Sequence, residues 1–275
     1  MAHATEARDQ YLASVARMEG GERQRIVIGT GHPGSTCQGA AFEYINNVHK
    51  DLVKRGLREK ADLLWFSNEP AVGDFGVGGL AVNYQGRLTT SEEFMTAIFR
   101  DSDIRWEVQK GARQVEPGRI FWEDYDGVEG ETEYDFSMLI PQFTGSPISY
   151  VDGQGQDITA APPRTGMVSG IIGRIVALNV IDLVQGREMS HRERMNEMFA
   201  ACIASMGDSL WDGSAATILI HPVVPDLARF PDSHGRDLSV SYMEMGLAGA
   251  WMKRVLHTTF IWKLKGNLGW KIIPE

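Results

Sequence analysis

The chain has 275 residues, of which 43% are hydrophobic and 23% are charged, and its formal net charge at pH 7 is −9. These values are typical of a globular protein with one or two domains, and they exclude a disordered chain and a protein with many membrane spans. The acidic balance excludes a general nucleic-acid-binding surface, because phosphate recognition requires a basic footprint.

The cysteine content is low, with only Cys37 and Cys202 in the whole sequence. Two thiols do not make the disulfide framework of a secreted protein, and no Cys/His spacing typical of a metal site occurs, so no bound metal is expected. The first twenty residues include Glu6 and Asp9 and lack the apolar core of a signal peptide. No run of eighteen or more uncharged apolar residues occurs, so no membrane-spanning helix is expected.

The first half of the chain predicts an α/β domain. After an N-terminal helix within residues 1–21, the apolar run 24–28, a long helix from Thr36 to Arg55 and a second strand over 62–70 form a βαβ pattern. Such a unit makes a parallel sheet with a right-handed crossover. Together with a helix over 91–100 and short strands over 104–108, 118–124 and 136–140, it predicts a Rossmann-like parallel-sheet domain over residues 22–145.

Residues 146–245 are expected to hold a linker, a buried helix and a β-hairpin. The hairpin strands are predicted at 198–207 and 214–222, and the helix at 165–186. This helix is apolar around more than half of its circumference, as in helices that are buried on most sides. The rest of the chain offers cover for one side only, so we expect another protein chain, a second copy or an unlike partner, to pack against it.

Residues 246–275 differ from the acidic remainder, because they contain five basic residues and one acidic residue. Basic side chains interleaved with aromatic ones are typical of an amphipathic helix that docks on a membrane surface. The alternative is a C-terminal helix that packs on the core and leaves its lysines in water. The docking interpretation predicts a peripheral membrane protein on the cytoplasmic side, with these residues at the membrane: Trp251, Lys253, Arg254, Phe260, Trp262, Lys263 and Trp270.

A glycine-rich turn follows the first apolar strand. Gly29, Gly31 and Gly34 have the G-x-G-x-x-G spacing of a dinucleotide-binding loop at a helix N-terminus. Pro33 removes one amide donor from such a loop, and the nearest candidate for a ribose-binding acid, Glu69, lies 40 rather than about 20 residues after Gly29. The sequence leaves open whether these glycines bind a cofactor or are required sterically.

The two cysteines also have two interpretations each. Cys37 is expected in the first turn of the long helix, where the helix dipole stabilises a thiolate, although an inert buried cysteine is the alternative. Cys202 lies among small residues on an apolar strand, which is typical of core packing but could also leave room for a chain of sulfur atoms.

Several stretches, in this order, resemble the sulfide:quinone oxidoreductases of the disulfide-oxidoreductase flavoprotein superfamily. They are IVIGTGHPGSTCQGAAFEYINNVHKDLVKRG, LLWFSNEPAVGDFGVGGL, YDFSMLIPQFTG, PPRTGMVSG, ACIASMGD and the basic-aromatic tail. The resemblance runs from Gln24 to Glu275. It implies that Cys37 and Cys202 are the redox pair that flanks a flavin and carries sulfur, and that Gly29, Gly31, Gly34, Thr165 and Gly166 belong to cofactor-type loops.

The sequence departs from this family in two respects. The segment PQFTGSPISYVDGQGQDITAAPPRTG is too short to contain the family's strand ending in Gly-Asp that holds the phosphate side of the flavin, and a whole domain is missing. The family's FAD-binding Rossmann domain, with its own glycine motif and a third cysteine, has no counterpart before Gln24. The resemblance therefore implies the sulfur-handling half of a membrane-associated flavoprotein that passes electrons from sulfide to quinone, with FAD bound through a partner chain. The alternative is a catalytically inactive structural or scaffold subunit of a membrane complex.

Overall fold

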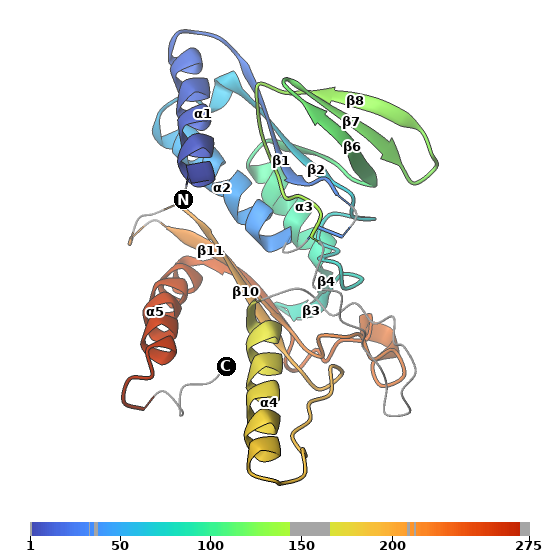
Figure 1. The fold of residues 1–275 in the computed structure, drawn as a ribbon. Helices are drawn as coiled ribbons and strands as arrows, with labels where there is room; N and C mark the ends of the chain where they lie inside the picture. Colours follow the sequence, from blue (N-terminus) through green and yellow to red (C-terminus); the bar gives the residue numbers. More distant parts are fainter. Residues whose placement is uncertain are drawn as a thin grey trace.

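The computed structural model describes residues 2–32, 34–35, 38–143, 166–207, 210–211 and 213–269. A parallel sheet and an antiparallel sheet lie on either side of helix α2 (Gln38–Lys54) (Figure 1). The fold is therefore of the predicted mixed α/β class. The predicted site residues Cys37, Thr165 and Trp270 lie outside the described residues, as does most of the predicted linker.

The parallel sheet has the order β5-β2-β1-β9 and confirms the predicted Rossmann-like unit. Its strands are β1 (Gln24–Thr30), β2 (Ala61–Ser67), β5 (Ile104–Glu107) and β9 (Phe136–Leu139). β1 and β2 are buried on both faces, which explains why both read as continuous apolar runs. A short 3-10 helix (Arg58–Lys60) leads from α2 into β2.

Helices cover one face of this sheet. Apolar side chains of α1 (Ala2–Glu19), α2 and α3 (Ser91–Asp101) form one core with β1 and β2. The N-terminus of α3 has a capping box: Thr90 Oγ1 accepts from Glu93 N, and Thr90 N donates to Glu93 Oε2, both at 3.1 Å. The predicted helices are thus confirmed. In each of them the apolar face is the one that packs into this core.

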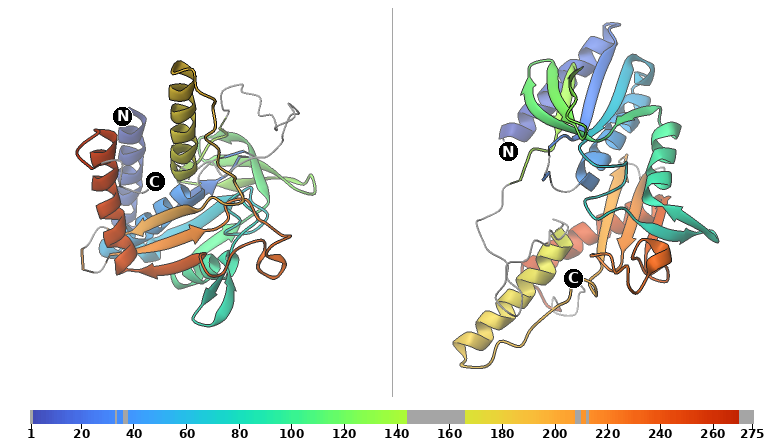
Figure 2. Two further views of the ribbon diagram at one scale, coloured as in Figure 1. Left: turned by 90° about the horizontal axis from the view of Figure 1, so that it is seen from below. Right: turned by 90° about the vertical axis from the view of Figure 1, so that its right-hand side faces the viewer.

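The other face is covered by a separate antiparallel sheet of β6 (Lys110–Glu116), β7 (Arg119–Asp124) and β8 (Glu129–Glu133) (Figure 2). Val27 and Leu64 pack there against Ala112 and Ile120. The segment 118–124 was expected to complete the parallel-sheet domain, and this was wrong in detail. Only two residues separate β6 from β7, and such a short connection joins antiparallel strands but not parallel ones.

The second half of the chain contains an antiparallel sheet of β10 (Ala200–Met206), β11 (Ser214–Ile220) and β12 (Tyr242–Gly246). The predicted hairpin is β10–β11, and β12 is an additional strand. One face of the sheet packs on α2, because Ala204, Met206 and Ala216 belong to the same core as the α2 side chains. The hairpin of β3 (Ala81–Tyr84) and β4 (Arg87–Thr90) contacts β12 through β3, and a 3-10 turn (Pro231–Ser233) precedes that strand.

Helix α5 (Leu247–Leu264) begins on β11 and then leaves the sheet. Its Gly249 is packed so closely that a Cβ there would overlap Thr217 Oγ1. Gly249 and Ala250 are its buried residues. The remaining turns carry large exposed apolar side chains, among them Val255 and Leu264.

Helix α4 (Gly166–Val184) projects away from the sheets (Figure 2). Val168 in its first turn packs against Ala200 and Val223, whereas Val180, Leu183 and Val184 are at least half exposed. The residues that the structure describes therefore do not cover the helix in the way that its apolar composition predicts. It is also long and apolar enough to cross a membrane, whereas the sequence predicted no such helix. The criterion of an uncharged apolar run missed it because Arg174 and Asp182 interrupt the run.

A cluster of polar side chains lies at the C-terminal end of α4. The carboxylate of Asp182, which is 5% exposed, accepts from Arg187 at 2.8 Å and lies 3.1 Å from His191 Nε2. Asn179 exchanges two hydrogen bonds with the backbone of His191, each 3.0 Å long. The segment after α4 thereby folds back along its last turns.

Candidate functional site

The three glycines at the end of β1 and in the turn after it are explained by close packing and backbone conformation. A Cβ on Gly29 would overlap the carbonyl oxygen of Phe66 on the neighbouring strand. A Cβ on Gly31 would lie 3.1–3.3 Å from side chains of Leu139, Phe66 and Ala112, and the Gly31 carbonyl accepts from the amide of Ala112. Gly34 has a φ of 76°, which favours glycine. The steric interpretation therefore suffices for this motif.

Cys202 belongs to β10, and its sulfur lies against the start of α2. The side chain is half-buried on β10, opposite Ile218. A Cβ on Gly39, in the first turn of α2, would lie only 2.6 Å from Cys202 Sγ, so the absence of a side chain at Gly39 lets the sulfur reach this helix end. In sequence Cys37 comes two residues before Gly39. The predicted closeness of the two sulfur atoms stays a prediction, because Cys37 lies outside the described residues.

A glycine-rich loop, Gly73–Leu80, lies beside the same sulfur. Val77 and Leu80 belong to the apolar cluster against which both Phe75 and Cys202 pack. A Cβ on Gly76 would lie 3.3 Å from the amide nitrogen of Gln38, the first residue of α2. Four glycines of the loop have positive φ, as does Phe75 at 57°, an unusual value for a residue with a side chain. The loop, the helix start and β10 thus meet around Cys202.

A buried acid holds this loop from the parallel sheet. Glu69, just after β2, is 6% exposed, and its Oε1 accepts from Phe75 N at 2.9 Å. Its Oε2 accepts from Ser67 Oγ at 2.7 Å, and Ser67 shares a 2.9 Å hydrogen bond with Thr30 of β1. Burial raises the pKa of Glu69 to about 7, although the hydrogen bonds from Ser67 and Phe75 favour the ionised form. In the sequence Glu69 stood out only by its unsuitable distance from the glycine motif.

A second acid, Glu43 of α2, connects three elements near the sulfur. Its carboxylate pairs with Lys253 of α5 and accepts from Ser205 of β10, three residues after Cys202. One helical turn later, Asn47 donates to the Ser205 carbonyl and accepts from Gly207 N, both at 2.8 Å. Lys253 is thus engaged by an acid of the same chain, and its role at the membrane stays a prediction. Sequence reasoning missed Glu43 because its partners are more than 150 residues away.

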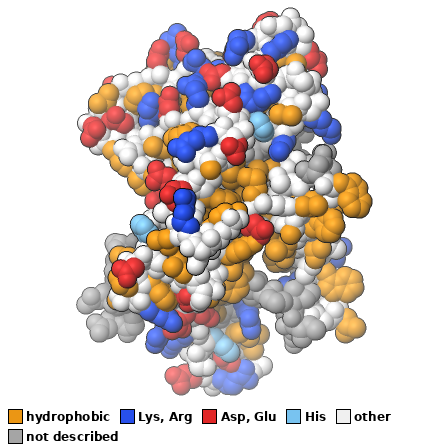
Figure 3. All heavy atoms as spheres, turned by 180° about the vertical axis from the view of Figure 1, so that it is seen from behind, with side chains coloured by type: hydrophobic (Ala, Val, Ile, Leu, Met, Phe, Trp, Pro, Cys, Tyr) orange, Lys and Arg blue, Asp and Glu red, His pale blue; other side chains and the backbone are white. Residues whose placement is uncertain are grey.

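The other predicted membrane residues lie mostly at the surface of α5. Trp251, Phe260 and Trp262 are roughly half exposed, and Arg254 is exposed, whereas Lys263 is half-buried. Hydrophobic side chains gather over this part of the molecule in Figure 3. Trp251 is anchored, since its Nε1 donates to the Leu210 carbonyl at 2.8 Å. At the start of α4, Gly166 is exposed, and Thr165 beside it lies outside the described residues.

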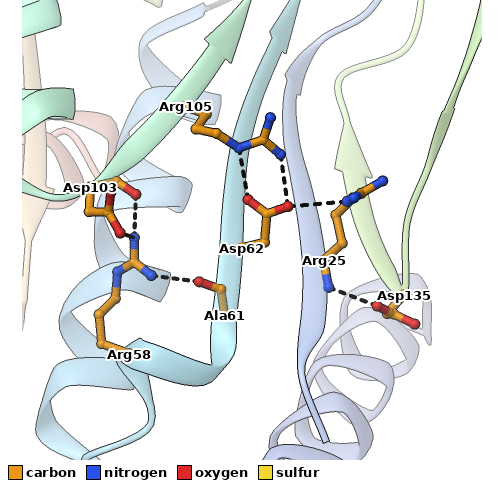
Figure 4. Close-up of polar contacts among 7 residues, drawn as sticks. All are labelled: Arg25, Arg58, Ala61, Asp62, Asp103, Arg105 and Asp135. Carbon is orange, nitrogen blue, oxygen red and sulfur yellow. Dashed lines mark hydrogen bonds and ion pairs between the residues drawn. The ribbon is translucent and has the colours of Figure 1, made fainter.

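A charged network lies at the opposite edge of the parallel sheet, where its strands begin (Figure 4). Asp62 of β2 accepts two hydrogen bonds from Arg105, at 2.7 and 2.9 Å, and one from Arg25 at 3.1 Å. Burial opposes ionisation, but the two arginines outweigh it and lower the pKa of Asp62. Asp135 accepts from Arg25 N at 2.7 Å, which ties β9 to β1. Parallel sheets bind ligands at the carboxyl ends of their strands, so this network fixes strand order rather than forming a site.

No family model matches the chain. It is 25% identical to the sulfide-quinone reductase of Aquifex aeolicus (strain VF5) over 282 aligned positions, which cover 88% of this chain and 59% of that protein. The chain is therefore similar to sulfide-quinone reductase over most of its own length. The solved structure of the sulfide:quinone oxidoreductase from the same bacterium superposes on it with a TM-score of 0.66 and 24% identity, covering 89% of this chain and 59% of that structure. The chain thus shares the fold of the matched part of that structure and spans about three-fifths of its length.

Proposed function

We propose that this chain is the sulfur-handling part of a membrane-associated oxidoreductase that passes electrons from sulfide to quinone. The observation that carries the proposal is the position of Cys202 Sγ against the first turn of α2, the helix that follows Cys37 in sequence. The partial positive charge of a helix N-terminus stabilises a thiolate there. In this proposal Cys37 and Cys202 carry sulfur atoms between them, as the homology to sulfide-quinone reductase suggests.

FAD does not fit the turn after β1 in this chain. A bound pyrophosphate needs backbone amides that a ligand can approach, whereas Gly31 is enclosed by Leu139, Phe66 and Ala112. We therefore assign flavin binding to residues supplied together with another polypeptide, and we assign no reaction step to it. Quinone is the proposed electron acceptor in the membrane.

Single substitutions of Cys202 and Cys37 by serine test the proposal. In native membranes or the purified native complex, we expect each to lower sulfide-dependent quinone reduction by about a hundredfold or more, because serine forms no sulfur–sulfur bond. Thermal melting should change little. Ser239→Ala, at an exposed position in the loop before β12, is the control and should retain most activity. A colourless native complex without sulfide-dependent activity would instead support the structural-subunit alternative.

We further propose that α5 docks on the membrane and that another protein chain covers α4. Phe260, Trp262 and Leu264 expose large apolar surfaces next to basic residues, and Val180, Leu183 and Val184 do so on α4. Serine at 260, 262 and 264 together should reduce flotation with anionic vesicles at least about tenfold, because apolar area and lipid charge drive such binding. Val115→Ser, an equally exposed position on β6, is the control and should float normally.

Light scattering on the detergent-solubilised protein tests the cover of α4. We expect a particle larger than one chain, and serine at 180, 183 and 184 should dissociate it. A stable monomer of the unsubstituted chain would contradict this part of the proposal. Unchanged flotation of the triple variant in α5 would contradict the other.

A further inference from the structure

The Gly73–Leu80 loop is held on its second side by a buried arginine. Arg236 is fully buried, and its guanidinium donates to the carbonyls of Val77 and Gly79 in the loop, at 2.6 and 3.1 Å. It also donates to the carbonyls of Pro222 and Val223, at 2.5 and 3.1 Å. Arg236 therefore ties the loop to the segment that follows β11.

This arginine has no acidic partner among the described residues, and its Nε makes no hydrogen bond there. Burial lowers the pKa of Arg236 to about 10. Burying an unpaired cation is costly, and such groups are retained where they fix a particular conformation. Here the fixed element is the loop.

Two anchors hold the loop through different backbone groups. Glu69 holds Phe75 through its backbone amide, and Arg236 holds Val77 and Gly79 through their carbonyls. Phe75, Val77 and Leu80 lie at or beside these contacts, and they share an apolar cluster with Cys202. A loop whose backbone is mostly left-handed would adopt other conformations readily without such anchors, because glycine restricts it little.

We propose that the Gly73–Leu80 loop is a gate on Cys202, and that Glu69 and Arg236 are the positioning residues that keep it closed against all but small sulfur nucleophiles. The half-buried sulfur is then reachable by hydrosulfide or a short polysulfide, while a bulky thiol or disulfide is excluded. The substrate class rests on the proposed function. The closed loop itself rests only on the contacts described above.

The test is the rate at which Cys202 is modified in the full chain, measured by peptide mass spectrometry with a small probe, methyl methanethiosulfonate, and with a bulky maleimide–polyethylene glycol. Glu69→Ala removes the acceptor for Phe75 N. We expect it to raise the rate for the bulky probe about tenfold or more and the rate for the small probe about threefold or less. Glu69→Gln keeps an acceptor oxygen and should retain the unsubstituted ratio of the two rates.

Thr132→Val controls for general loosening. It removes a 3.0 Å hydrogen bond from Trp122 on the far antiparallel sheet and should leave both rates unchanged. Phe75→Ala is a second gate variant that keeps both anchors but removes a ring that packs on the same apolar cluster as Cys202, and it should also admit the bulky probe. Bulky-probe rates at the unsubstituted level in both folded gate variants, or an equal rise in Thr132→Val, would overturn the proposal. The measurement needs no flavin and no turnover, so its failure is distinct from failure of the proposed enzyme activity.

Discussion

Alanine in place of Gly29 is expected to prevent the chain from folding stably. The new methyl group would overlap the carbonyl oxygen of Phe66, and both residues lie in adjacent, fully paired parallel strands. Neither backbone can yield without breaking the β1–β2 ladder at the centre of the core. Overpacking of a core costs about 1–3 kcal/mol even where side chains can adjust, so we expect a loss of more than about 3 kcal/mol here. Soluble yield and the melting temperature measured by circular dichroism would report it.

Gly173→Ala is the matched control. Gly173 is exposed within α4, and a Cβ there would meet no atom within 4 Å. The same substitution should stabilise this helix by roughly 0.5–1 kcal/mol, because alanine loses less backbone entropy than glycine. A Gly29→Ala protein that melts like the unsubstituted chain would show that the glycine is not required for strand packing.

Glu69→Gln is expected to change how stability depends on pH. The pKa of Glu69 in the folded chain is about 7, above its ordinary value of 4.5, so the folded state holds a proton that the unfolded state has lost. The contribution of Glu69 is therefore fully present below about pH 4.5 and is lost as the pH rises to about 7. A shift of this size corresponds to about 3 kcal/mol.

Urea unfolding of both proteins between pH 4.5 and 7.5 measures this effect. The free energy of unfolding of the unsubstituted chain, minus that of Glu69→Gln, should fall by about 3 kcal/mol across this range and then level off. Other titrating groups, including Asp74 nearby, are common to both proteins and cancel in the difference to first order. A difference that does not change with pH would mean that Glu69 titrates normally in the folded state.

The parallel sheet could be predicted because its strands are apolar on both faces and α2 separates them at βαβ spacing. β8 could not, since its sequence EGETE contains three glutamates and becomes a strand only by pairing with β7. β12 is short and was missed for the same reason. Strand propensity is weak where the partner strand supplies most of the stabilisation.

The candidate site was predictable only in part. The family resemblance pointed to Cys202, and the structure brings its sulfur to the start of α2. Glu69 and Arg236 were not recognised, because a charged residue in a loop sequence such as DSHGRDLS looks solvent-exposed. Burial depends on residues far away: Arg236 reaches Val77 across a separation of 159 positions. Sequence spacing carries no record of such contacts.

Helix α2 packs against both the parallel sheet and the β10–β12 sheet, and this affects how the molecule can move. Its side chains pack with β1 and β2 on one side and with Ala204 and Met206 of β10 on the other, in a single continuous core. Hinge motion between the two halves would separate the side chains of that core. We therefore expect no domain closure of the kind seen in many two-domain enzymes. We expect conformational change near Cys202 to occur in segments other than α2 and β10. The distance between this helix and this strand should then stay constant.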